Sequence, residues 1–129
     1  MTNHYCCFRV KSLENSIEFY TRTLGMNLIK KLDNDEYEYS LAWLGYGDEF
    51  KDICLELTYN WDNREYRHGT YFGQLVLGVP DVYAATKSAE EKGAKVIRPA
   101  GPLKGGNMVI SFIEDIDGYR IEFVPEKLS

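Results

Sequence analysis

Short stretches of alternating apolar and polar residues run along the chain in two sets of four. The first set covers 5–10, 27–32, 37–45 and 52–58, and the second covers 73–79, 94–99, 107–114 and 119–125. This alternation is typical of strands that bury one face. After the first strand of each set, apolar residues recur at helical spacing over 13–25 and 80–93, and a glycine ends each run. The pattern predicts a helix at both places.

The two sets share one order of elements, which is a strand, a helix and three more strands. The spacing from Val10 to Gly25 is nearly the same as the spacing from Val79 to Gly93. This internal repeat predicts an α+β fold of two tandem βαβββ modules, at about 1–60 and 71–129. The chain has 129 residues, the length of one domain, so we expect both modules to form a single domain, 1–129.

Superposing the two modules on these landmarks pairs four polar residues. Tyr5 and Gln74 fall at the start of the first strand of each module, and Glu56 and Glu122 fall in the last strand. The residues on either side of each glutamate are apolar and must face the helix, so both glutamates point to the other side of their sheet. Each could be an ordinary solvent-facing residue, but their symmetric placement favours a shared functional site.

His4 and Tyr5 are adjacent at the start of the first strand, so their side chains point to opposite faces. Alternation groups Tyr5 with Cys7 and Arg9, and the repeat places this face beside the glutamates. His4 would join them only through a register slip that turns the whole strand over. We therefore expect Tyr5 to face the functional side and His4 to face away. His68 is expected in a polar loop, exposed to solvent.

Composition and charge exclude several classes of partner. The net charge is −5 and no basic block is present, which argues against nucleic acids and anionic membranes. No stretch approaches the roughly 20 apolar residues of a membrane span, and the first residues lack a signal segment. We expect a cytoplasmic protein. Cys6, Cys7 and Cys54 form no disulfide or zinc pattern and are expected to be buried free thiols, with a redox or ligand role for one of them as the alternative.

Five longer motifs follow one another along the chain: FRVKSLENSIEFYTRTLGM, DEYEYSLAWLGYG, LELTYNWDNREYRHG, AGPLKGG and DIDGYRIEF. Together they resemble bacterial glyoxalase I (lactoylglutathione lyase), a family of the vicinal-oxygen-chelate superfamily, essentially from end to end. The resemblance implies the glyoxalase/bleomycin-resistance/dioxygenase-like fold. It also implies a homodimer that forms the active-site cleft, with half of the metal ligands from each chain.

Members of that family isomerise the hemithioacetal of methylglyoxal and glutathione to S-lactoylglutathione. The resemblance implies glutathione as co-substrate and a divalent metal, which stabilises the enediolate as a Lewis acid. By position, Glu56 and Glu122 match two metal ligands and catalytic residues, and Glu122 matches the base. Tyr5 and Gln74 match the two remaining ligand positions.

Four further residues resemble those that hold the glutathione carboxylates, namely Arg9, Asn60, Arg98 and Lys104. A local cationic group suits an anionic substrate on a protein of negative net charge. For Arg98 and Lys104 the alternative is a pair of solvated loop charges.

The two remaining ligand positions depart from the family, because bacterial members carry histidine at both. An amide oxygen from Gln74 can bind a hard cation, whereas the phenol of Tyr5 binds well only when deprotonated. The metal could be nickel, zinc, manganese or magnesium, and a set of oxygen donors suits magnesium, manganese or calcium better than nickel or zinc. The motif Asp115-Ile116-Asp117-Gly118-Tyr119 also replaces the family's D-P-D-G-Y turn.

Three functions remain open from the sequence. The first is a glutathione-dependent lyase with an altered metal site, which the glutamates and the basic residues favour. The second is a catalytically inactive binding protein on the same fold that lacks the metal, which Tyr5 and Gln74 favour. The third is another metal enzyme of the superfamily, such as an extradiol dioxygenase, but its two histidines and carboxylate around iron have no match here.

Overall fold

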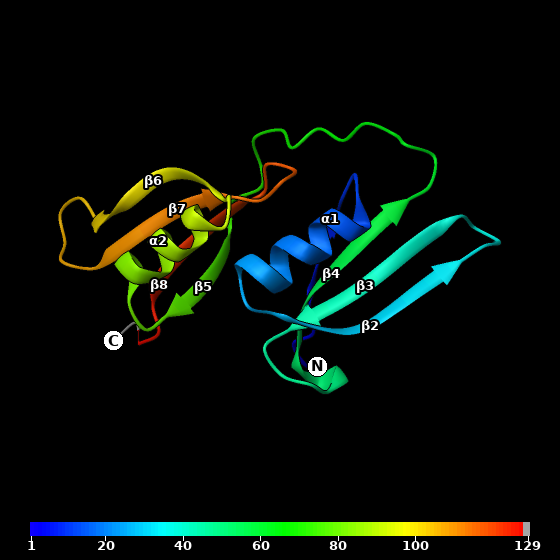
Figure 1. The fold of residues 1–129 in the computed structure, drawn as a ribbon, viewed down its shortest axis with the longest axis horizontal. Coiled ribbons are helices and arrows are strands. Elements are labelled where there is room, and N and C mark those ends of the chain that lie inside the picture. The colour runs from blue at the N-terminus through cyan, green and yellow to red at the C-terminus, as the bar shows by residue number, and fades with distance from the viewer. Residues whose placement is uncertain (128–129) are drawn as a thin grey trace. The chain divides into compact units, whose positions relative to one another are not determined.

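A computed structural model of the chain describes residues 1–127, in two compact units, Met1–Arg67 and residues 68–127 (Figure 1). Each unit contains one four-stranded mixed sheet and a helix that packs on one face of that sheet. The α+β fold class predicted from the repeat is confirmed. Among the described residues, no helix is long and apolar enough to cross a membrane.

The first unit contains β1 (Cys6–Arg9), α1 (Leu13–Glu18), β2 (Asn27–Asn34), β3 (Tyr39–Gly45) and β4 (Ile53–Asn60). A π-helical segment, Phe19–Thr23, continues α1, and a 3-10 turn, Phe50–Asp52, leads into β4. The strand order is β1-β4-β3-β2, with β1 parallel to β4 and the other pairs antiparallel. The strand β4 therefore lies between β1 and β3.

The second unit contains β5 (Leu75–Val79), α2 (Val82–Glu91), β6 (Lys95–Pro102), β7 (Val109–Glu114) and β8 (Arg120–Pro125). Its strand order is β5-β8-β7-β6, and β5 runs parallel to β8 while the other pairs are antiparallel. The topology repeats that of the first unit, and β8 takes the place of β4.

Local sequence explains where the helices begin and end. The Ser12 hydroxyl accepts the backbone N–H of Asn15 at 3.3 Å, and the Asp81 carboxylate accepts that of Ala84 at 3.2 Å, so both helices have a side-chain N-cap. Gly93 follows α2 with a φ of 98°, in the left-handed region that glycine adopts without strain.

The helix of the first unit differs from the prediction. The sequence predicts one helix over 13–25, but the regular α-helix ends at Glu18 and the next turn is π-helical. There the N–H of Leu24 bonds to the carbonyl of Phe19, five residues back, at 3.3 Å. The Thr21 hydroxyl also donates to the Ile17 carbonyl at 2.7 Å, and such bonds to the preceding turn bend helices.

Alternation along β4 and β8 separates two faces of each sheet. Leu55 and Leu57 are fully buried on the side where α1 packs, and Ile121 and Phe123 are buried on the side where α2 packs. Glu56 and Glu122 each lie between two of these apolar residues and point to the other side. The glutamates therefore lie on the helix-free face of their own sheets, as the alternation predicts.

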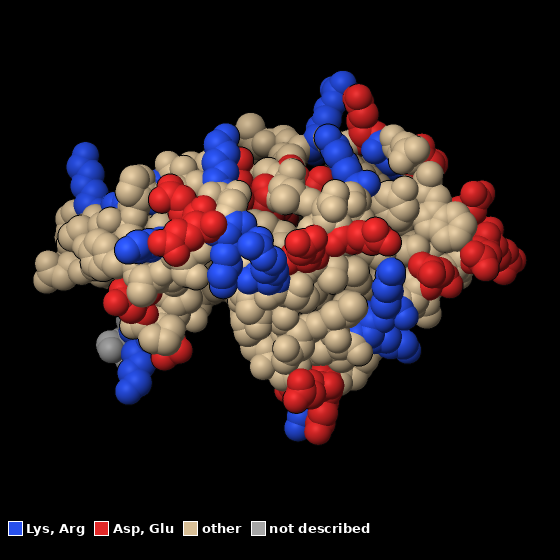
Figure 2. Space-filling model, viewed as in Figure 1, with Lys and Arg blue, Asp and Glu red and all other residues tan. Residues whose placement is uncertain are grey.

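Charged side chains of both signs are mixed on the face of the molecule drawn in Figure 2, and neither sign gathers into a large area. This mixture agrees with the sequence, in which 15 basic and 20 acidic residues are interspersed.

Candidate active site

Glu56 lies at the centre of the first sheet, with a residue of a neighbouring strand on each side. In the strand register Glu56 pairs with Cys7 of β1 and with Trp43 of β3. The indole Nε1–H of Trp43 donates to the Glu56 Oε2 at 2.8 Å, and the Thr58 hydroxyl donates to the Oε1 at 3.1 Å. Both oxygens of this carboxylate therefore accept a hydrogen bond.

The thiol of Cys7 extends this chain of hydrogen bonds. Its Sγ lies 3.1 Å from the Thr58 Oγ1. Partial burial raises the pKa of the Cys7 thiol, and the hydrogen bond with Thr58 opposes that shift. The Thr58 hydroxyl donates to Glu56 and also contacts the Cys7 thiol, so Thr58 links Cys7 to the carboxylate.

Tyr5 lies one residue before β1 and two residues before Cys7. The spacing of two assigns Tyr5 to the side of Cys7 and Glu56 in extended backbone. The side chain of Tyr5 is 39% exposed, and its ring contacts that of His4 edge-on with centroids 5.9 Å apart. Glu56 accepts its hydrogen bonds from Trp43 and Thr58. The role of Tyr5 as a metal ligand stays a prediction.

In the second unit the structure brings Gln74 and Glu122 together, although 48 residues separate them in the chain. The amide Nε2 of Gln74 donates to the Glu122 Oε1 at 3.1 Å. In the register Glu122 pairs with Val76 of β5 and Phe112 of β7, and Phe112 occupies the place that Trp43 has in the first unit. A phenyl ring has no N–H to donate, so the two glutamates differ in their partners.

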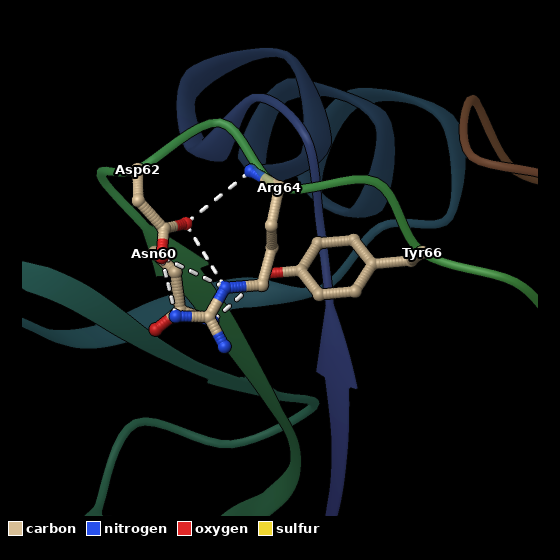
Figure 3. A network of polar contacts seen from close by, with 4 residues as sticks. All are labelled: Asn60, Asp62, Arg64 and Tyr66. Carbon is tan, nitrogen blue, oxygen red and sulfur yellow. Dashed lines mark hydrogen bonds and ion pairs between the residues drawn. The ribbon is translucent and has the colours of Figure 1, made fainter.

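Asn60, at the end of β4, belongs to a polar network of the following loop (Figure 3). Its Nδ2 donates to the Tyr66 hydroxyl at 2.8 Å. Beside it the Arg64 guanidinium forms an ion pair with the Asp62 carboxylate, which lowers the pKa of Asp62. A pocket of about 230 Å³ adjoins this network and is lined by Val10, Lys11, Tyr59, Asn60, Asn63, Arg64, Glu65 and Tyr66. The pocket belongs entirely to the first unit.

The remaining predicted binding residues lie in different settings. Arg9 pairs with Thr58 in the register, so it shares the helix-free face with Glu56 and is exposed. Lys104 lies in the exposed turn after β6. The guanidinium of Arg98 donates to four backbone carbonyls of Pro99, Gly101, Ile110 and Pro102 at 2.9–3.2 Å. Carboxylate binding by these residues, and by Asn60, stays a prediction.

The cysteines and His68 differ in part from the sequence expectation. Cys6, Cys7 and Cys54 are free thiols, but Cys54 is only half-buried, and Cys6, at the start of the edge strand β1, and Cys7, on the helix-free face of that strand, are exposed. Their predicted burial is wrong. His68 is exposed as expected, yet its Nε2 lies 2.8 Å from the carbonyl of Asp117 and its ring packs edge-on against Tyr119.

Trp43 is the site residue that sequence reasoning missed. It touches Glu56 only because β3 pairs with β4 in one particular register, and that register is not visible in the sequence. Thr58 could have been found, because it lies two residues after Glu56 on the same strand and therefore on the same face.

The donor atoms around Glu56 and around Glu122 determine which metal these residues could hold. Within residues 1–127, no group of three or more His, Cys, Asp or Glu side chains is gathered as a metal site. Glu56 supplies a carboxylate in the first unit, and Glu122 supplies another in the second, next to the amide of Gln74. With the phenol of Tyr5, these are oxygen donors, which fit a hard cation such as Mn²⁺ or Mg²⁺.

A family model described as Glyoxalase/Bleomycin resistance protein/Dioxygenase superfamily matches residues 2–123. The chain is 49% identical over 119 residues to the lactoylglutathione lyase of Haemophilus influenzae, covering 92% of this chain and 88% of that protein. It is 48% identical to the lactoylglutathione lyase of Escherichia coli O157:H7, with 92% and 88% covered.

Two solved structures extend the comparison to three dimensions. Glyoxalase I from Zea mays superposes with a TM-score of 0.88 at 39% identity, over 93% of this chain and 43% of the maize chain. This chain therefore spans less than half of the maize chain. The trypanothione-dependent glyoxalase I of Leishmania major gives a TM-score of 0.79 at 35% identity, over 95% of this chain and 84% of that one.

Proposed function

Since the chain belongs to the glyoxalase/bleomycin resistance protein/dioxygenase superfamily, we propose that it is a lactoylglutathione lyase. The substrate would be the hemithioacetal that methylglyoxal forms with glutathione, and the product S-lactoylglutathione. The observation that carries this proposal is the pairing of Gln74 with Glu122, in a strand position that matches Glu56 of the first unit. The relatives named lactoylglutathione lyase, at up to 49% identity, support it.

Glu122 is the residue that we assign to proton transfer. The reaction removes a proton from the carbon that bears sulfur and returns a proton to the neighbouring carbonyl carbon, so one base can serve both steps. The Glu122 carboxylate lies on the helix-free face of its sheet and accepts one hydrogen bond from Gln74. A carboxylate with a single side-chain donor can shift between two carbon atoms more easily than one held at both oxygens.

We propose that Glu56, Glu122, Gln74 and Tyr5 together hold a divalent cation. When bound, the cation supplies positive charge that stabilises the enediolate. Glu56 is the ligand that the chain fixes in place, because Trp43 and Thr58 each donate to one of its oxygens. Each oxygen has a second lone pair, so these hydrogen bonds orient the carboxylate and leave it able to bind a metal.

The family also supports a homodimer in which two chains supply the ligands of each site. Arg9, Asn60, Arg98 and Lys104 would hold the glutathione carboxylates, with Arg9 best placed because it shares the face of Glu56. A site of this kind needs a pool of glutathione, which the cytoplasm provides. We therefore propose that the protein acts there.

A second candidate function is a catalytically inactive binding protein on the same fold. One observation favours it: Gln74 turns its amide N–H toward Glu122, so a neutral donor stabilises this carboxylate without a cation. The two candidates differ in whether the thioester product forms at all.

A turnover assay on the metal-depleted protein separates them. Thioester formation from methylglyoxal and glutathione would be followed after adding Mn²⁺, Mg²⁺, Ni²⁺ or Zn²⁺, in wild type and in Glu122→Gln. The lyase predicts metal-dependent turnover that Glu122→Gln abolishes. A folded protein that forms no thioester with any of the four metals would instead support the binding protein.

A further inference from the structure

Trp43 is fixed in the first sheet more firmly than an ordinary strand residue on the helix-free face. Its side chain is 8% exposed, although its neighbours on that face, Cys54, Glu56 and Thr58, are each partly accessible. Its one polar atom, Nε1, has the Glu56 Oε2 as acceptor at 2.8 Å. A buried indole N–H that loses its acceptor is costly, so the ring and the carboxylate constrain each other.

Two neighbours hold the indole ring itself. The Phe50 ring packs against it, with centroids 5.8 Å apart and planes tilted by 54°. The Nζ of Lys30 lies 5.9 Å from the centroid of the indole and 5.8 Å from that of Phe50, so the ammonium group caps both rings. Phe50 comes from the 3-10 turn and Lys30 from β2, and together they leave the indole little freedom to turn away from Glu56.

The second oxygen of Glu56 is held from within its own strand, β4. Thr58 donates to the Oε1, and Cys7 of β1 lies behind Thr58. Trp43 belongs to β3, so a donor from one neighbouring strand and a donor from β4 itself converge on this carboxylate, and Cys7 of β1 adjoins the second donor. Glu56 therefore has one defined orientation within its unit.

The second unit has no such arrangement among its described residues. Phe112 takes the register position of Trp43 opposite Glu122, and the side chain that donates to Glu122 is Gln74. The same strand position in two repeated sheets thus carries a donor in one case and a hydrocarbon in the other. The donor two residues further along the strand differs as well, because Val124 stands in the second unit where Thr58 stands in the first.

We propose that Trp43 is a positioning residue that fixes the Glu56 carboxylate as an immobile ligand, while Phe112 leaves Glu122 the freedom to move a proton. This inference rests on the proposed function for the roles of the two glutamates. The contact between Trp43 and Glu56 can be tested without any turnover.

The first test uses the indole N–H signals in a ¹H–¹⁵N spectrum. The chain has two tryptophans, Trp43 and Trp61, so each signal is assigned by replacing the other with phenylalanine. Glu56→Ala is expected to shift the Trp43 signal and speed its hydrogen exchange, and to leave the Trp61 signal in place because that indole donates to Ser40. A Trp43 signal that does not respond to Glu56→Ala would overturn the proposal.

The second test is the affinity for Mn²⁺, measured in Trp43→Phe, with Trp61→Phe as the matched control. Loss of a group that orients a ligand is expected to weaken metal binding about tenfold, while the control stays within about twofold of wild type. In a Glu56→Ala background the effect of Trp43→Phe should vanish, because it acts through Glu56. An undiminished affinity in folded Trp43→Phe, or the same loss in both backgrounds, would contradict the proposal.

The two tests also separate this inference from the lyase proposal. A wild-type protein that binds Mn²⁺ but makes no thioester contradicts the lyase and leaves both tests able to decide the role of Trp43. A wild-type protein that binds no Mn²⁺ contradicts the assignment of Glu56 as a ligand, and with it the positioning role.

Discussion

The two units of this chain carry a glutamate at matching positions of matching strands, yet they surround it differently. Glu56 accepts hydrogen bonds at both oxygens, from Trp43 and Thr58, whereas Glu122 accepts one from Gln74. The register gives each glutamate an aromatic neighbour, an indole in one unit and a phenyl ring in the other. A duplicated fold can therefore produce two unlike carboxylates by exchanging a few neighbouring side chains, and the following variants test that difference.

Removing the charge of Glu122 should have the largest effect. In Glu122→Gln the amide cannot take a proton from carbon, so we expect kcat to fall by about 10²–10⁴-fold with little change in KM. Steady-state kinetics with saturating metal measures both. Glu126→Gln, which changes an exposed glutamate just beyond β8, is the matched control and should keep the wild-type kcat. Equal activity in both variants would contradict the role of Glu122.

Removing the partner of Glu122 should have a smaller effect. In Gln74→Ala the carboxylate loses its donor and the site loses one oxygen ligand, so we expect the Mn²⁺ affinity to fall by about 10-fold to 100-fold. Equilibrium binding of Mn²⁺ measures this loss. In Gln74→His an imidazole replaces the amide and should move the metal preference toward Ni²⁺ or Zn²⁺. A preference unchanged in Gln74→His would mean that position 74 does not contact the metal.

Arg98 tests how hydrogen bonds to backbone carbonyls stabilise the sheet of the second unit. The register of β6 is irregular on both sides of Arg98, and its guanidinium bonds four carbonyls around this irregularity. We expect Arg98→Ala to lower the free energy of unfolding by about 2 kcal/mol.

Urea unfolding measures this change, with Lys95→Ala as the control, because the 3.8 Å ion pair of Lys95 with Glu114 is exposed. The KM for the hemithioacetal, measured on the folded Arg98→Ala variant, tests the predicted carboxylate binding separately. A free energy of unfolding equal to that of wild type would show that the four hydrogen bonds contribute nothing.

Replacing Tyr46 should have the smallest effect on stability, and this effect should depend on pH. The Tyr46 hydroxyl donates to the Leu24 carbonyl at 2.8 Å. The residue as a whole is 55% exposed, and partial burial of its phenol raises the pKa from 10.0 to about 12. The folded state thus holds the proton more tightly than the unfolded state. The contribution of the raised Tyr46 pKa to the free energy of unfolding is present below pH 10 and is lost as the pH rises toward 12.

Thermal unfolding of wild type and Tyr46→Phe at several pH values checks this. We expect wild type to be the more stable near neutral pH and the difference to shrink from about pH 10 to pH 12. A difference that stays constant across this range would show that the phenol has its ordinary pKa.

Much of the fold follows from local patterns in the sequence. The apolar spacing of 80–93 predicts α2, and the alternation in 52–58 and 119–125 predicts β4 and β8 and the side to which their glutamates point. The break at Glu18 was not predicted, because a change from α-helical to π-helical hydrogen bonds leaves the apolar spacing of the helix almost unchanged. The exposure of Cys6 was missed because an edge strand cannot be recognised without the strand order.

The candidate site likewise contains residues that the sequence predicts and contacts that it does not. The repeat paired Gln74 with Tyr5 and grouped both with the two glutamates, and the structure brings Gln74 into contact with Glu122. The repeat could not find Trp43, whose contact depends on the pairing of β3 with β4. Nor could it show that Arg98 bonds backbone carbonyls, because these bonds arise at an irregularity of β6 that the sequence does not reveal.

The most direct test of the account is a titration of the metal-depleted wild-type protein with Mn²⁺, followed by the disappearance of the free-ion EPR signal. The account predicts saturable binding that is weakened by Glu56→Gln and by Glu122→Gln alike, since both carboxylates are proposed metal ligands. Mn²⁺ binding that neither substitution changes, or no binding by the folded protein, would contradict the proposal that Glu56 and Glu122 are metal ligands.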